Sequence, residues 1–288
     1  MNSWMKNIPD DTLISNINVP GTHNTCSLFC DFSFASRCQS HTLTEQLNMG
    51  VRFIDIRAEK KGDGLYVVHS ISKCYSPQKR RVRLSVKEVA DECFDFLKAH
   101  PTETIIFSFK RDAGDSPENT LKLFFETCIK GKENFWYTEN KTPEISRVRG
   151  KIVLLNRCAK TIDNTGFSGI SYGLDFTGWP YMERVENSHK LPMNFGTEKA
   201  YIQDFYKMNP KEKWTLAIKP FLLENLEENS VIINMFSGTT PLNLPKKYAK
   251  TVLKKFIKFP LEKQKKYGWI ILDYPTENVI KNIVESNF

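Results

Sequence analysis

Apolar runs rich in β-branched residues recur along the whole chain, and they limit most strongly how it can fold. Eight such runs cover residues 17–20, 51–57, 65–69, 104–110, 151–157, 170–175, 231–236 and 269–273. Several are almost continuously apolar, which is typical of strands covered on both faces. The pattern therefore predicts a mostly parallel sheet with helices packed around it.

Helical patterns lie between many of these runs. Ser85 and Glu88 have the spacing of a capping box, apolar residues at helical spacing follow, and Pro101 ends the segment. Further helices are predicted over 117–130 and 245–258. Only seven residues separate the second run from the third, which is too few for a helix.

We therefore expect an α/β fold: one domain over residues 1–288, an irregular (β/α)8 barrel of the TIM type. A helix is missing between its second and third strands. An open doubly wound sheet is the alternative fold. That fold would require a Gly-rich phosphate turn, and the chain has no GxGxxG motif.

Composition narrows the class of partner and the compartment. Lys and Arg number 41 against 33 Asp and Glu, and the resulting charge of +8 favours an anionic partner. No apolar run reaches membrane-spanning length, and residues 1–11 lack the apolar core of a signal peptide. Seven cysteines without a CxxC pair indicate reduced thiols rather than a zinc cluster. We expect a soluble, cytoplasmic chain, with secretion as the alternative.

Charged or imidazole side chains follow or end most of the predicted strands: His23, Asp55, Arg57, His69, Lys110, Arg157 and Asp273. In a parallel barrel these strand ends share the face on which such barrels do chemistry. Side chains alternate along a strand, so Asp55 and Arg57 point the same way. By the same alternation, Ser108 and Lys110 face the barrel axis, while Phe107 and Phe109 face the helices.

This set of side chains suits the cleavage of a phosphodiester. One histidine can take a proton from an attacking hydroxyl, and the other can protonate the leaving oxygen. The planar fork of an arginine matches phosphate oxygens. Each residue also has a plainer interpretation, since a lone histidine is often structural and Asp55 with Arg57 can form a buried ion pair.

Several motifs resemble a known family. They read PGTHNT at 20–25, GVRFIDIR at 50–57, LYVVH at 65–69, RGKIVLLNR at 149–157, QDFY at 203–206 and WIILDY at 269–274. In this order, over nearly the whole chain, they are similar to the X-domain signature of bacterial-type phosphatidylinositol-specific phospholipases C. The resemblance implies a distorted barrel that cleaves phosphatidylinositol to diacylglycerol and inositol 1,2-cyclic phosphate.

The resemblance also implies a role for each matching residue. His23 would be the general base, oriented by Asp273, and His69 the general acid. Arg57 would bind the phosphate, with Asp55 supporting it. The inositol ring would be held by Lys110, Arg157, Asp204, Tyr206 and Trp179.

Two positions bear on the use of metal. Calcium-dependent relatives carry an acidic ligand where this chain has Arg57, so we expect an enzyme without metal or other cofactor. Bacterial relatives usually have Asp directly after the first histidine, where it supports the acid histidine. Asn24 stands there instead, as it does in calcium-using relatives.

A lipid substrate requires contact with a membrane surface. In the family, the region of Phe29, Phe32 and Phe34 forms a short helix at the barrel rim that inserts into lipid; a core-facing loop is the alternative. Leu242 belongs to a second candidate rim loop. We expect a monomer that acts on phosphatidylinositol in membranes and does not bind nucleic acid, because no aromatic–basic motif accompanies the charge.

Two other functions compete with this interpretation. The first is a metal-dependent phosphodiesterase acting on glycerophosphodiesters, which the cation Arg57 in the pocket disfavours. The second is a non-catalytic module that binds inositol lipids. A decayed site would be expected to lose at least one of His23, His69, Arg57 and Asp273.

Overall fold

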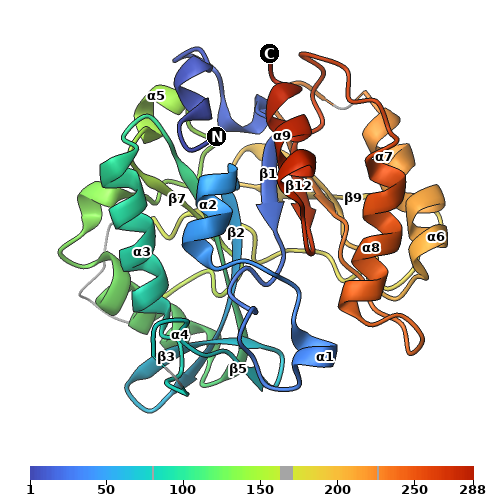
Figure 1. Ribbon diagram of the computed structural model, residues 1–288. Coiled ribbons are helices and arrows are strands. Elements are labelled where there is room, and N and C mark those ends of the chain that lie inside the picture. The colour runs from blue at the N-terminus through green and yellow to red at the C-terminus, as the bar shows by residue number, and fades with distance from the viewer. Residues whose placement is uncertain (80, 163–170, 226) are drawn as a thin grey trace.

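Eight parallel strands curl around the centre of the molecule. The computed structural model describes residues 1–79, 81–162, 171–225 and 227–288 (Figure 1). The parallel strands, in their order around the barrel, are β8 (Leu174–Asp175), β7 (Ile152–Asn156), β5 (Ile105–Gly114), β2 (Phe53–Lys61), β1 (Val19–Thr22), β12 (Trp269–Leu272), β11 (Val231–Met235) and β10 (Glu198–Gln203). Among the described residues no pairing joins β8 to β10, so the barrel is open there. The predicted TIM-type barrel is confirmed.

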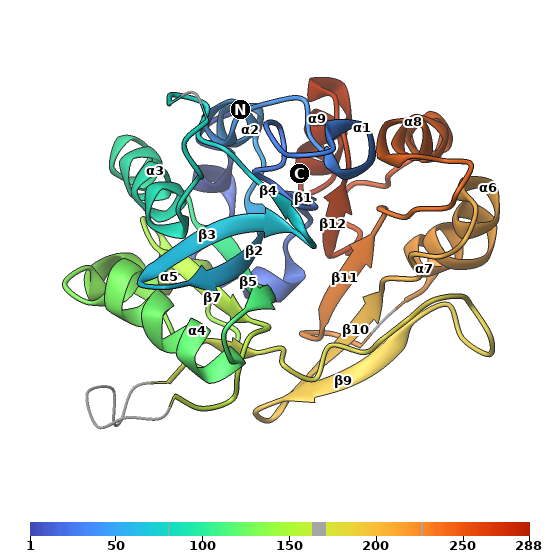
Figure 2. The same cartoon turned by 90° about the horizontal axis from the view of Figure 1, so that it is seen from below.

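Helices surround the strands on the outside, as the view from below shows (Figure 2). They are α1 (Ser33–Ser36), α2 (Leu43–Met49), α3 (Val86–Ala99), α4 (Pro117–Phe124), α5 (Ile145–Val148), α6 (Pro210–Lys213), α7 (Lys219–Leu223), α8 (Pro245–Phe256) and α9 (Glu277–Glu285). The capping box of Ser85 and Glu88 begins α3 as predicted. The helix predicted over 245–258 is observed as α8. The helix predicted over 117–130 begins as α4 and continues through a wider helical turn to Ile129.

One predicted strand does not belong to the barrel. Residues 65–69 lie in β3 (Gly64–His69), which pairs antiparallel with β2 as a hairpin. The prediction that no helix separates the two segments is correct, but a hairpin is the reason. The next barrel strand, β5, follows α3 along the chain.

The barrel strand that the sequence analysis missed is β10. It begins with two charged residues, the partly exposed Glu198 and the exposed Lys199, and ends in the polar Gln203, so it forms no continuous apolar run. It pairs antiparallel with β9 (Leu191–Phe195). The remaining short strands are β4 (Ser72–Lys73) and β6 (Trp136–Tyr137). The end of the predicted run at 170–175 is observed as β8. Residue 170, the first of that run, lies outside the described residues.

The strand direction fixes where chemistry can occur. Both termini lie near one end of the barrel, and β1 points toward the other, where α1 lies (Figure 1). Phe107 and Phe109 of β5 pack against Phe124 of α4, on the helix side as predicted. Ser108 points the other way, and its hydroxyl lies 3.5 Å from the Asp55 carboxylate. No helix in the described part of the chain is both long and apolar enough to span a bilayer.

Candidate active site

A cavity of about 450 Å³ opens at the carboxyl ends of the strands. Most of the predicted site residues line it: His23, Arg57, His69, Lys110, Arg157, Trp179, Asp204, Tyr206 and Asp273. Asp55 and Asn24 are buried beneath the lining residues. The structure thus gathers into one site residues that span most of the chain.

His23 and Asp273 meet because their strands are neighbours in register. Thr22 of β1 pairs with Leu272 of β12, so the next residue of each strand reaches the cavity together. His23 Nδ1 lies 2.8 Å from Asp273 Oδ1. Gly21 permits this close approach, since a Cβ there would lie 2.4 Å from the Ile271 side chain.

The hydrogen bonds of His23 indicate its tautomer. The Asp273 carboxylate can only accept, so Nδ1 carries the proton. The amide Nδ2 of Asn24 donates to His23 Nε2 over 2.9 Å. Nε2 is therefore a hydrogen-bond acceptor, as a general base requires.

His69 approaches from the β2–β3 hairpin. Its ring is nearly perpendicular to that of His23, at 85°, with the centroids 5.9 Å apart. Its Nδ1 donates to the carbonyl oxygen of Ser36, 2.6 Å away. Burial, together with the neighbouring His23 and Arg57, lowers the pKa of His69 to about 4. His69 is therefore neutral in the free enzyme near pH 7.

Arg57 is held at the centre of the site by carboxylates. Its Nε donates to Asp55 Oδ2 over 3.1 Å, and Arg157 Nη1 lies 3.5 Å from the other oxygen of Asp55. Burial alone would raise the pKa of Asp55, but the two guanidinium groups hold it well below its usual value. Asp55 is therefore an anion that fixes two cations at the cavity wall.

Asp112 belongs to the site but was absent from the sequence prediction. One of its oxygens lies 2.8 Å from Lys110 Nζ, and the other 3.7 Å from Arg57 Nη1. The predicted strand ended at Lys110, whereas β5 continues to Gly114. Extending the alternation of Ser108 and Lys110 by one step would have found Asp112.

Aromatic and charged groups build the opposite wall. The Arg157 guanidinium stacks 3.6 Å from the centre of the Trp179 ring. Trp179 Nε1 donates to Asp204 Oδ2 over 3.1 Å. The hydroxyl of Tyr206 donates to that of Tyr181 over 2.7 Å, and Tyr181 is a lining residue that the sequence analysis did not single out.

Asn24 contacts a different partner from the one that the family pattern implies. Asp at this position would support the acid histidine, yet the described contacts of Asn24 include His23 and not His69. Its backbone N–H also donates to Asp55 Oδ2 over 3.2 Å. Its φ of 43° is left-handed, a conformation that Asn and Asp tolerate better than most residues.

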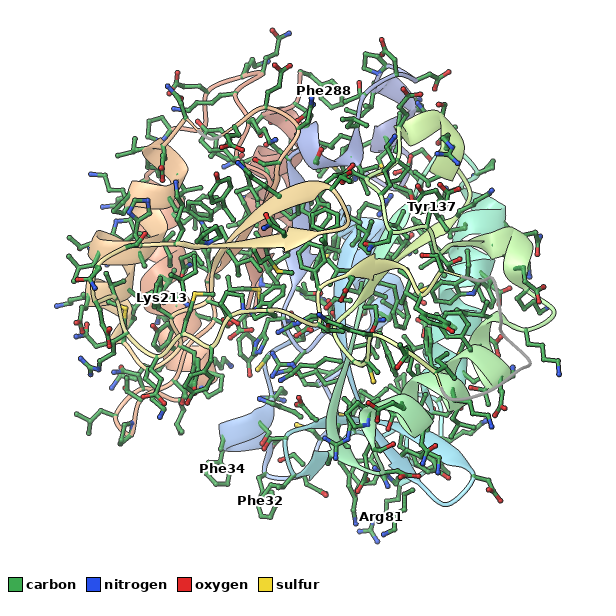
Figure 3. The ribbon with its side chains drawn as sticks, turned by 180° about the vertical axis from the view of Figure 1, so that it is seen from behind. Phe32, Phe34, Arg81, Tyr137, Lys213 and Phe288 are labelled. Atoms are coloured by element: carbon green, nitrogen blue, oxygen red, sulfur yellow. The ribbon has the colours of Figure 1, made fainter. Side chains whose placement is uncertain are left out.

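Apolar side chains project into solvent at the rim of the cavity. Phe32, directly before α1, and Phe34, within α1, point away from the molecule (Figure 3). Their exposed fractions are 60% and 70%. Phe29 and Leu242 are exposed as well. The alternative prediction, a core-facing loop at Phe29, Phe32 and Phe34, is therefore wrong.

Comparisons with known proteins agree with the motifs. The family model described as "Phosphatidylinositol-specific phospholipase C, X domain" matches residues 16–158. The 1-phosphatidylinositol phosphodiesterase of Listeria monocytogenes is 29% identical, covering 99% of this chain and 84% of that protein. Its counterpart in Staphylococcus aureus strain Newman is 27% identical, over 99% and 94%.

Solved structures are similar over the full length. The phosphatidylinositol-specific phospholipase C of L. monocytogenes superposes with a TM-score of 0.77 and 26% identity, covering 100% of this chain and 98% of that one. A variant of the S. aureus enzyme gives a TM-score of 0.79 at 24% identity, over 100% and 97%. In sequence and in fold, the chain is therefore similar over its whole length to the bacterial-type phosphatidylinositol-specific phospholipases C, and its residues 16–158 match the X-domain family model.

Proposed function

We propose that this chain cleaves phosphatidylinositol to diacylglycerol and inositol 1,2-cyclic phosphate, without a metal ion. One observation carries the proposal: two imidazoles of different environment line a single cavity together with Arg57, and one of them is held by a carboxylate. This arrangement supplies a base, an acid and a phosphate-binding cation. The names of the relatives from Listeria and Staphylococcus support the same substrate.

His23 begins the reaction. Its Nε2 takes the proton of the inositol 2-hydroxyl, and the oxygen attacks phosphorus. Asp273 stabilises the imidazolium that forms, as carboxylates do in other base–orienter pairs. Asn24 must yield its hydrogen bond to Nε2 when the hydroxyl binds.

His69 completes the reaction by protonating the glycerol oxygen as its bond to phosphorus breaks. Because Nδ1 is engaged by Ser36, the proton is delivered from Nε2. The low pKa of His69 in the free enzyme must rise for this role. The negative charge of the bound phosphodiester raises it, since an opposite charge nearby favours the protonated form.

Arg57 replaces a metal ion in this scheme. Its guanidinium stabilises the charge that builds up on the phosphate oxygens. The carboxylates around it already face cations: Asp55 faces Arg57 and Arg157, and Asp112 faces Arg57 and Lys110. These ion pairs disfavour the alternative of a glycerophosphodiesterase with a carboxylate-bound metal.

The inositol ring would occupy the cavity beside Trp179. Asp204 and the cations Lys110 and Arg157 would bind its hydroxyls, and Tyr206 would stack on the ring; the proposal is supported by their shared position in the cavity lining. The enzyme would approach the bilayer with Phe29, Phe32, Phe34 and Leu242, which are exposed near the cavity mouth. A similar S. aureus structure concerns modulation of that enzyme's membrane binding.

The experiment compares diacylglycerol release from phosphatidylinositol vesicles by the wild type, His23→Ala and His69→Ala. We expect both variants to lose about 10²–10⁴-fold in kcat, the usual contribution of a positioned acid or base. Vesicle binding, measured by co-sedimentation, should persist in both. Equal activity in all three proteins would refute the roles of the histidines, and binding without activity in the wild type would favour a non-catalytic module.

A further inference from the structure

Cys38 is a buried thiol in the cavity wall that the proposed reaction does not use. Its segment is firmly tied to the two strands that carry His23 and Asp273. The Cys38 N–H donates to Ser27 Oγ, and its carbonyl accepts from Tyr274 N over 2.9 Å. The next side chain, Gln39, donates to the carbonyl oxygens of His23 and Leu272.

The thiol completes a cluster of possible metal ligands. One ligand atom each from His23, Cys38 and Asp273 lies within 4.8 Å of the other two. All three side chains line the cavity, and hydrogen bonds join the backbone segments that carry them. Cys38 Sγ also lies 4.0 Å from His69 Nδ1.

We infer that His23, Cys38 and Asp273 form an inhibitory site for Zn²⁺. Thiolate, imidazole and carboxylate are the ligands that Zn²⁺ prefers, and three protein ligands with one open position are common in accessible zinc sites. The fourth position would face the cavity. Ca²⁺ and Mg²⁺ prefer sets of oxygen ligands and do not suit this cluster.

Zinc at this site would disable the base. Coordination through Sγ, Nδ1 and Oδ1 releases the thiol proton to solvent and moves the imidazole proton from Nδ1 to Nε2. An imidazole with a metal on Nδ1 and a proton on Nε2 has no lone pair for the substrate hydroxyl. Asp273 would be turned from the imidazole to the metal.

Asn24 can accommodate this change. Its Oδ1 is buried and has no hydrogen-bond partner among the described residues. A half-turn of the amide would present this oxygen to the new proton on Nε2, in place of the Nδ2 that donates to it in the free site. The metal-bound state therefore leaves no donor facing a donor.

The binding test uses the full chain after EDTA treatment and desalting. Zn²⁺ is titrated by calorimetry, and Co²⁺ serves as a spectroscopic probe because its thiolate complexes absorb strongly in the near ultraviolet. We expect one Zn²⁺ per chain and a Co²⁺–thiolate band. Cys38→Ser should abolish the band and weaken Zn²⁺ binding by more than about tenfold. The matched control is Cys158→Ser, a half-buried thiol outside the cavity.

The activity test compares each protein with its own zinc-free rate. Zn²⁺ should inhibit the wild type and Cys158→Ser at the same concentration. It should inhibit Cys38→Ser only at a concentration more than about tenfold higher. Ca²⁺ and Mg²⁺ should inhibit none of the three proteins. Equal binding in Cys38→Ser, or bound zinc without inhibition of an active enzyme, overturns the inference. The inhibition depends on the proposed function, but metal binding does not: a chain inactive on phosphatidylinositol that binds Co²⁺ through Cys38 would refute the function and retain the site.

Discussion

Arg57 is the residue on which the proposed metal-free mechanism depends. Two carboxylates orient its fork toward the cavity, and a lysine cannot reproduce that planar geometry. We predict that Arg57→Lys lowers kcat by about 10²–10³-fold, as loss of a preorganised donor does in other enzymes. Arg83→Lys, which alters an ion pair with Glu59 outside the cavity, is the control. Comparable rates for the two variants would contradict the role of Arg57.

The low pKa of His69 makes a prediction about pH. In the free enzyme the acid loses its proton above a pKa of about 4, so the population ready for catalysis falls as pH rises. The bound phosphodiester raises that pKa, and kcat reports the bound state whereas kcat/KM reports the free enzyme. We therefore expect kcat/KM to peak at a lower pH than kcat. Coincident profiles would show that the substrate does not shift His69.

Asn24→Asp places a new negative charge against His23, whose ring centroid lies 5.9 Å from that of His69. A carboxylate favours the protonated form of each, so the pH profile of kcat/KM should move to higher pH. Turnover near pH 7 should be kept or raised, because more His69 is protonated there. The left-handed backbone at this position tolerates Asp. A large loss of turnover at every pH would reveal a role for the amide that this mechanism omits.

At the scale of single residues, the sequence predicted most of the side chains that line the cavity, because parallel strands end at one face. It did not find Asp112, since the end of β5 was placed too early. It also did not predict that Ser36 binds His69 or that Cys38 lies near Asp273. Those contacts depend on the path of the loop after β1, which no local pattern determines.

At the scale of elements, Arg52, directly before β2, has a structural role. Arg52 is fully buried; its Nε donates to Glu103 over 2.9 Å, and its other nitrogens donate to backbone carbonyls, including that of Asn2. Glu103 in turn accepts from Met5 N. The pair therefore ties the N-terminal segment to the base of the barrel, far from the cavity.

Glu103→Ala should destabilise the fold without altering the site. Removing one partner leaves Arg52 buried and unpaired, which costs about 3–5 kcal/mol. The measurement is urea unfolding, with kcat determined at a temperature where the variant is folded. Asp10→Ala, which removes the exposed partner of Arg149, should cost less than about 1 kcal/mol. Equal losses in the two variants would contradict this assignment.

Elements were predictable where their pattern was unambiguous. The capping box and proline stop predicted α3 closely, and continuous apolar runs predicted β5, β7, β11 and β12. An apolar run does not reveal strand direction, so β3 was placed in the barrel although it forms a hairpin. The half-exposed β10 lacked the signal altogether.

For the whole molecule, the exposed Phe32 and Phe34 lie with α1 at the end of the barrel toward which β1 points (Figures 1 and 3), and Ala35 of α1 lines the cavity. Burying an exposed phenylalanine ring in lipid contributes up to about 1.5–3 kcal/mol. We predict that Phe32→Ser and Phe34→Ser each weaken binding to phosphatidylinositol vesicles about tenfold or more. Cleavage of a soluble, short-chain phosphatidylinositol should be unaffected in both. Leu223→Ser, at an exposed position on α7, is the control; unchanged vesicle binding in the Phe variants would place the membrane contact elsewhere.

The central claim is that this barrel forms a cyclic phosphodiester with arginine in place of a metal. The most direct measurement is phosphorus NMR of the purified chain with phosphatidylinositol in mixed micelles, with and without EDTA. We predict an inositol cyclic phosphate signal that grows at the same rate, or faster, when EDTA is present. Loss of that signal on chelation would contradict the metal-free mechanism, and absence of product in both samples would contradict the proposed activity itself.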